Sequence, residues 1–314
     1  MSLHTQYRPL RFEDVIGQDT TVSSLKRVVK DRRARAFIFT GPSGTGKTTL
    51  ARILANEFAD GKATAANLEE VDGASNSGAD AIRAIVGRSA YRAVGSSPSK
   101  AILIDECHAL SAAAWKVLYK PIEEPQKHLT WLLCTTEPGK IPKPIQTRCL
   151  RYDLKPVKDE LIYELLLKVA EAEKFDVNEE VLEAIAEGSS GSPRMALVGL
   201  ELALGCTNAA EARAVMQSAT SAPEAVALAR WLVGGCRGGW LEALKLLNAI
   251  EADPESIRVM TTNYIATVLS NSKEVAKAQK LLSLLECFAK SYNPSDGKAP
   301  LLLSLGLALG LDRQ

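Results

Sequence analysis

Short β-rich runs, most of them apolar, alternate with longer amphipathic stretches through the first half of the chain. Four of the runs predict strands, over Ala36–Thr40, Leu68–Asp72, Ala101–Asp105 and Leu129–Thr135. Helical patterns fall between them, for example at residues 48–58 and 79–93. Strand and helix alternating at this spacing indicate a parallel sheet with helical crossovers, and therefore an α/β fold.

From about Lys155 the pattern becomes helical. Apolar residues recur three and four positions apart, and the breaker Gly188-Ser189-Ser190-Gly191 separates two of the helices. We therefore expect three domains: an α/β domain over residues 1–155, a small helical domain over 156–220 and an all-helical domain over 221–314.

The composition, with 46% apolar and 24% charged residues, is that of a globular protein. Basic residues number 38 and acidic residues 37, so the net charge identifies no partner, and nucleic-acid binding would depend on local charge placement. The six cysteines lack the paired spacing of a zinc ribbon, so we expect reduced cytoplasmic thiols and no zinc. The apolar run Ala299–Leu311 is too short to cross a bilayer, and no membrane partner is expected.

The clearest chemistry follows the first predicted strand. The sequence Gly41-Pro42-Ser43-Gly44-Thr45-Gly46-Lys47-Thr48 fits the pattern G-x-x-x-x-G-K-[ST] between a strand and a helix. The glycines let backbone N–H groups turn towards phosphate oxygens, and the helix N-terminus adds a positive dipole. Lys47 is expected to reach the β- and γ-phosphates of ATP, and Thr48 to bind Mg²⁺. The adjacent Thr49 completes this nucleotide-binding set.

A pair of acids ends the third predicted strand. Asp105 is placed to orient the Mg²⁺ shell, and Glu106 to polarise an attacking water. An exposed pair of acids alone would be a weak signal, but its position at the end of a second core strand, after the phosphate loop, makes it a strong one.

With these residues in view, Asp105-Glu106-Cys107-His108 resembles the acidic box of AAA+ ATPases. More narrowly, residues 6–205 resemble the clamp-loader ATPases, a family that includes bacterial gamma/tau subunits and replication factor C small subunits. The matching segments are Tyr7-Arg8-Pro9, Phe12–Gln18, Asp72–Gly78, His108–Ser111, Ile122–Pro125, Leu133–Pro138, Thr147-Arg148-Cys149 and Gly191–Arg194.

The resemblance implies further roles. Thr136 would contact the γ-phosphate or the attacking water, and Arg194 would reach the phosphates from the helical domain. Arg148 would act on the ATP of a neighbouring subunit as an arginine finger, which implies an oligomer. The N-terminal segment would hold the nucleotide base, through Tyr7, Arg8, Pro9, Val15 and Ile16.

Residues 81–104 contain no acidic side chain and four basic ones, Arg83, Arg88, Arg92 and Lys100. Together with the resemblance, this favours Arg83 and Lys116 as contacts to a DNA backbone. Tyr91 and Val94, at the expected end of the same helix, would contact a sliding clamp, and the C-terminal helices would form a collar that joins subunits.

The sequence therefore favours an ATPase subunit of a sliding-clamp loader, with primer–template DNA, the clamp and other loader subunits in a homo- or hetero-pentamer as partners. The expected location is the cytoplasm, or the host cytoplasm for a viral protein. Two alternatives remain open: a DNA motor of the Holliday-junction branch-migration type, and a largely structural loader subunit.

Overall fold

A computed structural model describes residues 2–62, 64, 66–204, 206–221, 223–236, 238–248, 250, 254–270, 272, 275–292 and 297–311. The chain forms two compact units. The first, here called the α/β unit, comprises Thr5–Ile162 and Gly191–Arg194. The second, here called the helical unit, comprises Met1–His4, Tyr163–Ser190 and Met195–Gln314.

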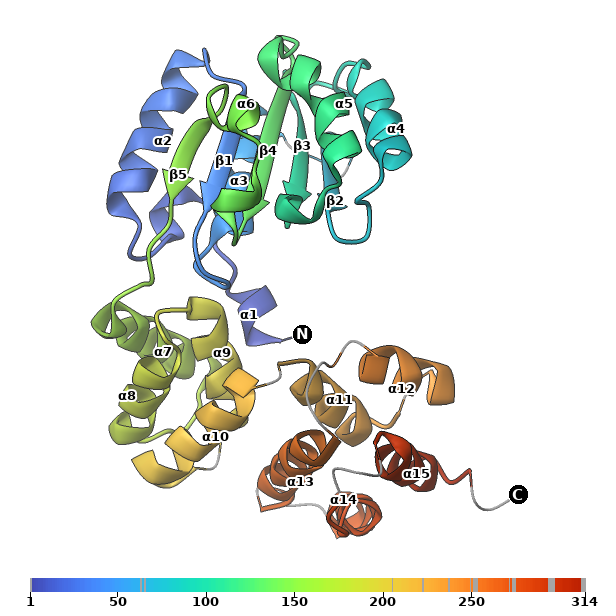
Figure 1. Ribbon diagram of the computed structural model, residues 1–314. Coiled ribbons are helices and arrows are strands. Elements are labelled where there is room, and N and C mark those ends of the chain that lie inside the picture. Colours follow the sequence, from blue (N-terminus) through green and yellow to red (C-terminus); the bar gives the residue numbers. More distant parts are fainter. Residues whose placement is uncertain are drawn as a thin grey trace. The chain divides into compact units, whose positions relative to one another are not determined.

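The α/β unit is built on a five-stranded parallel sheet in the order β2-β3-β4-β1-β5 (Figure 1). The strands are β1 (Ala36–Thr40), β2 (Leu68–Asp72), β3 (Lys100–Asp105), β4 (Leu129–Thr135) and β5 (Leu150–Asp153). The expected α/β fold is confirmed, and so are the four expected strands. The edge strand β5 was not expected.

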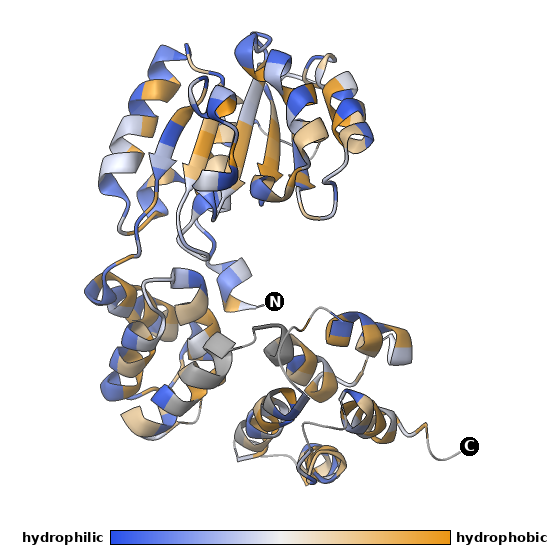
Figure 2. Cartoon of the chain, in the orientation of Figure 1, coloured by the Kyte–Doolittle hydropathy of each residue, from blue (hydrophilic) through white to orange (hydrophobic). Residues whose placement is uncertain are grey.

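Alternate residues of the central strands point to opposite faces of the sheet. Phe37 and Leu103 pack against α2 (Asp19–Asp31) and α3 (Lys47–Phe58). Ile38 and Trp131 pack on the other face, against α4 (Ala79–Ser89), α5 (Ala112–Glu123) and α6 (Lys143–Gln146). With both faces covered, β1 and β4 are buried along their whole length and mostly apolar (Figure 2), which is typical of a buried parallel sheet.

Helix α4 ends at Ser89, four residues before the expected end at Ala93. Beyond this end the chain bonds to another segment. The side chain of Asn67 accepts a hydrogen bond from the Val94 N–H (2.7 Å) and donates one to the Val94 carbonyl (3.0 Å). Both backbone groups of Val94 are thus satisfied outside a helix.

Short elements connect these layers: α1 (Leu3–Gln6), η1 (Phe12–Asp14), η2 (Cys107–Ala109) and η3 (Pro138–Lys140). The remaining helices are α7 (Asp159–Glu173), α8 (Glu179–Gly188), α9 (Pro193–Leu202), α10 (Ala209–Ser221), α11 (Pro223–Val233), α12 (Gly239–Asn248), α13 (Pro254–Ser270), α14 (Val275–Cys287) and α15 (Ala299–Ala308).

Within the helical unit, Leu228, Ile257, Phe288 and Leu301 share one apolar core. The division of the helical region at residue 220 stays a prediction. In the described part of the chain, every helix is too short or too polar to cross a membrane.

Candidate active site

The loop between β1 and α3 takes a shape that its glycines permit. Gly41 and Gly44 have φ angles of +141° and +75°, a region that other residues rarely adopt. A Cβ atom on Gly41 would lie 2.5 Å from the carbonyl oxygen of Leu154. Helix α3 begins at Lys47, so the loop ends at the positive end of a helix dipole.

The residues at the start of α9, distant in sequence, lie against this loop. A Cβ atom on Gly44 would lie 2.0 Å from Ser192 Oγ and 3.3 Å from Arg194 Cβ. Both residues stand at the start of α9 and belong to the α/β unit. The structure therefore places Arg194, expected at the phosphates, directly beside the glycine-rich loop.

The side chain of Lys47 lies against the loop. Its ammonium donates hydrogen bonds to the carbonyls of Gly41 and Pro42, both at 2.9 Å, and the residue is buried. Burial lowers the pKa of Lys47, and the nearby carboxylate of Glu106 opposes that shift. Thr45 braces the same turn, because its hydroxyl donates to the Pro42 carbonyl at 2.8 Å.

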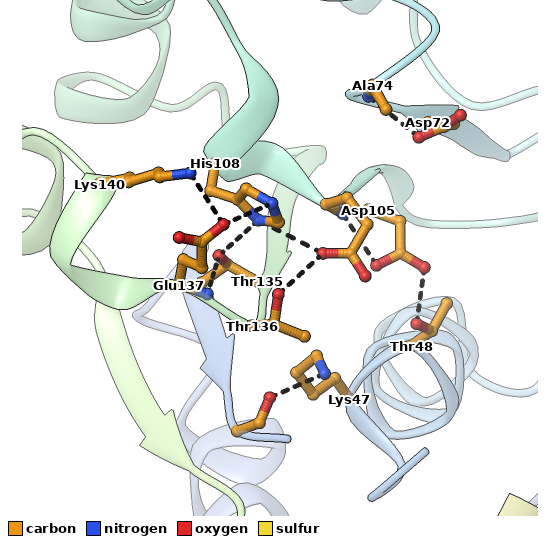
Figure 3. Close-up of polar contacts among 12 residues, drawn as sticks. Lys47, Thr48, Asp72, Ala74, Asp105, His108, Thr135, Thr136, Glu137 and Lys140 are labelled. Carbon is orange, nitrogen blue, oxygen red and sulfur yellow. Dashed lines mark hydrogen bonds and ion pairs between the residues drawn. The ribbon is translucent and has the colours of Figure 1, made fainter. Parts of the chain in front are cut away.

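Thr48 and Asp105 meet at the carboxyl end of the sheet. The Thr48 hydroxyl donates to Asp105 Oδ2 at 2.7 Å, and Asp105 Oδ1 accepts the Glu106 N–H at 3.0 Å (Figure 3). A hydroxyl beside a carboxylate is the kind of oxygen donor set that Mg²⁺ takes, together with phosphate oxygens. The glycine cradle, the lysine and these oxygens fit a magnesium nucleotide.

Glu106 follows β3 with a φ of +45°, an uncommon conformation for a residue with a side chain. The hydroxyl of Thr136 donates to Glu106 Oε2 at 3.4 Å, which is a long contact. Nδ1 of His108 lies 3.3 Å from the same oxygen. The acid expected to act on water thus contacts His108, which follows β3, and Thr136, which follows β4.

The N-terminal segment reaches the first turn of α3. Arg8 Nε donates to the Thr49 hydroxyl at 3.1 Å, and burial, followed by the charge of Arg52, lowers the pKa of Arg8. The other residues expected at the nucleotide base, Tyr7, Pro9, Val15 and Ile16, are partly buried.

Arg148 is held within its own subunit in this structure. One guanidinium nitrogen donates to Glu123 Oε1 at 2.8 Å and another to the Pro144 carbonyl at 2.7 Å. A third of the side chain is exposed, at 33%. A role on a neighbouring nucleotide stays a prediction.

Residues 81–104, here called the acid-free segment, are partly neutralised in the structure, because acidic side chains from outside the segment pair with its basic ones. Arg88 pairs with Glu69 on β2 at 2.5 Å, and Lys100 lies 3.9 Å from the same carboxylate. Arg83 forms an ion pair with Asp80, and Lys116 is exposed on α5. The apolar pair beyond α4 is solvent-facing, with Tyr91 73% and Val94 67% exposed.

Sequence reasoning named no role for His108 or Glu137. His108 Nε2 lies 3.2 Å from Glu137 Oε1, and Lys140 donates to the same oxygen at 2.9 Å. Their positions in the sequence could have indicated a role, since His108 lies two residues beyond the acid pair and Glu137 follows Thr136.

Comparisons with known proteins agree with this geometry. The family described as "ATPase family associated with various cellular activities (AAA)" matches residues 37–156. The replication factor C small subunit of Archaeoglobus fulgidus is 32% identical over 247 residues, which cover 78% of this chain and 76% of that protein. DNA polymerase III subunit tau of Bacillus subtilis is 37% identical over 222 residues, 65% of this chain. The chain spans only 39% of the Bacillus protein's length.

Among solved structures, the RuvB Holliday junction branch migration motor of Thermotoga maritima superposes with a TM-score of 0.56. The match covers 83% of this chain and 91% of RuvB, at 22% sequence identity. At that identity the likeness shows a shared fold alone.

Proposed function

The chain belongs to the clamp-loader family of AAA+ ATPases, and we propose that it is the ATPase subunit of a loader that opens a ring-shaped sliding clamp and places it on primer–template DNA. One observation carries the proposal: three groups lie together at the carboxyl end of the sheet. They are the lysine of the glycine-rich loop, the Thr48–Asp105 pair, and Glu106 with Thr136. The match to replication factor C small subunits over most of both chains supports the clamp-loading part.

ATP and Mg²⁺ are the proposed ligands. Bound Mg²⁺ would polarise phosphoryl oxygens and neutralise charge that develops during transfer. Lys47 is already desolvated and makes two carbonyl hydrogen bonds, which it can exchange for phosphate oxygens. Thr48 and Asp105 orient the metal shell, and Glu106 accepts a proton from the attacking water.

Four further roles complete the proposal. Thr136 and Arg194 act on the phosphates in the same subunit, and Arg148 acts on the nucleotide of a neighbouring subunit. Arg83 and Lys116 contact the DNA backbone, while Tyr91 and Val94 contact the clamp. The large exposure of these last two side chains supports an interface, because tyrosine is enriched among the residues that anchor protein interfaces.

The test is ATP hydrolysis by the chain with its partner subunits, measured with and without clamp and primed DNA. We expect stimulation by the two together. Lys47→Ala should abolish hydrolysis, and Arg148→Ala should remove the stimulated rate, by about a thousandfold or more. Arg213→Ala is the matched control for Arg148, because Arg213 is also exposed and paired with a carboxylate, Glu187.

A stimulated rate that Arg148→Ala leaves intact would show that the arginine does not act in trans. Strand separation or junction migration in place of clamp loading would refute the loader assignment itself.

A further inference from the structure

His108 is the centre of a polar chain that the proposed mechanism does not use. Its ring is mostly buried, with 17% of the side chain exposed. Nδ1 faces Glu106 Oε2 at 3.3 Å and Thr135 Oγ1 at 3.1 Å, while Nε2 faces Glu137 Oε1 at 3.2 Å (Figure 3). The imidazole donates to both carboxylates when both of its nitrogens carry protons.

The far side of the ring has partners of its own. Lys140 donates to Glu137 Oε1 at 2.9 Å, and the Glu137 backbone N–H donates to Thr135 Oγ1, also at 2.9 Å. The backbone of Glu137 is thus anchored to the strand end that also contacts His108 Nδ1, and its carboxylate meets Nε2. The contacts of the ring with Glu137 and Thr135 favour one ring plane, and with it one direction of Nδ1.

Glu106, by contrast, has few restraints of its own. Its side chain is 41% exposed, and its contact with Thr136 is long, at 3.4 Å. A glutamate side chain has three rotatable bonds and loses considerable rotamer freedom when it is fixed in one place. A general base must stand within hydrogen-bond reach of its proton, and a displacement of about 1 Å can cost about a hundredfold in rate.

We propose that His108 is a positioning residue for ATP hydrolysis: the Nδ1 side of its ring orients the carboxylate of Glu106, and Glu137 with Lys140 orients the ring. The proposal rests on the proposed function, in which Glu106 acts on the attacking water. Glu137 and Lys140, which follow β4, thus help to position Glu106, which follows β3.

Two amide substitutions separate the two sides of the ring. The amide nitrogen of Asn occupies nearly the position of Nδ1, whereas that of Gln occupies nearly the position of Nε2. His108→Asn therefore keeps the contact to Glu106, and His108→Gln keeps the contact to Glu137. Both replace the ring with a smaller side chain, so each controls for lost packing in the other.

The experiment measures kcat for ATP hydrolysis and the Kd of a fluorescent ATP analogue, with the full chain in its loader complex. We expect His108→Ala and His108→Gln to lower kcat by about ten- to a hundredfold. His108→Asn should stay within about threefold of the parent chain, and Kd should stay within about twofold in all three variants. In a Glu106→Gln background, His108→Ala should have no further effect on kcat, because the two residues act as one unit.

Equal losses in the Asn and Gln variants would overturn the proposal, as would a kcat for His108→Ala within twofold of the parent. If His108→Ala does not fold, the comparison of Asn with Gln decides. Failure of the proposed function would look different: the parent chain would then hydrolyse ATP no faster than Lys47→Ala.

Discussion

Gly44→Ala tests whether the shape of the glycine-rich loop depends on the start of α9. Two costs are expected. An alanine at a φ of +75° costs about 1–2 kcal/mol, because its Cβ approaches the following carbonyl. The new Cβ would also lie 2.0 Å from Ser192 Oγ, so this buried hydroxyl must leave its position. That displacement costs about 1 kcal/mol.

The sum, about 2–3 kcal/mol, favours other loop shapes over the one in the structure. Nucleotide binding must then restore the original shape, so the affinity falls by the same free energy. At about 1.4 kcal/mol for each factor of ten, Gly44→Ala should weaken binding of a fluorescent ATP analogue with Mg²⁺ by about 30- to 140-fold. Equilibrium titration measures the Kd, and circular dichroism checks that the variant is folded.

Two controls divide the cost into its parts. In a Ser192→Ala background the nearest atoms to the new Cβ are Ser192 Cβ at 3.2 Å and Arg194 Cβ at 3.3 Å, so Gly44→Ala should cost only about tenfold. Gly61→Ala has a similar φ of +72°, no described atom within 4 Å and no place in the loop, so it should leave Kd unchanged. The reasoning is refuted if Gly44→Ala binds within twofold of the parent, or loses equally in both backgrounds.

Other consequences concern the core and the thiols. Phe58→Ala removes a buried ring that packs 5.9 Å from the Phe37 ring, and should lower the free energy of unfolding of the α/β unit by about 3–5 kcal/mol; a loss below 1 kcal/mol in urea denaturation would contradict this. Complete burial raises the pKa of Cys134, so iodoacetamide should modify the partly exposed Cys206 before Cys134, as peptide mapping by mass spectrometry would show. Burial raises the pKa of Cys149 to about 12 from 9.0, so the unfolded thiol ionises first and the stability it contributes below pH 9 is lost as pH rises towards 12. The denaturation midpoint should therefore fall less steeply above pH 9 in Cys149→Ala than in the parent chain.

Features written in a contiguous stretch of sequence were predictable. The three inner strands, β1, β3 and β4, follow from continuous apolar runs, and the loop from Gly41 to Thr48 follows from spacing alone. Strand β5 was missed because its residues, Leu150-Arg151-Tyr152-Asp153, form a short, partly exposed edge with no apolar run. The sequence signal for a strand depends on burial, and an edge strand of this length has little.

Features that depend on two distant segments were not predictable from local pattern. The chain beyond α4 is bonded at Val94 to Asn67, which lies before β2. The positive charge of the acid-free segment is partly balanced by Glu69 from the neighbouring strand. His108 gains its neighbours because β3 and β4 are adjacent in the sheet and their following residues meet at one edge. The sequence contains these residues, but it does not show that they lie close together in the fold.

The interleaving of the two units has a practical consequence for dissecting the protein. Gly191–Arg194 belongs to the α/β unit although it comes after 28 residues of the helical unit, Tyr163–Ser190. A fragment cut at Ile162 would look complete by its sheet, yet it would lack the Ser192 and Arg194 that border Gly44. Fragments for crystallography or nucleotide screening should therefore extend through α9, to Leu202, so that Ser192 and Arg194 remain beside the glycine-rich loop.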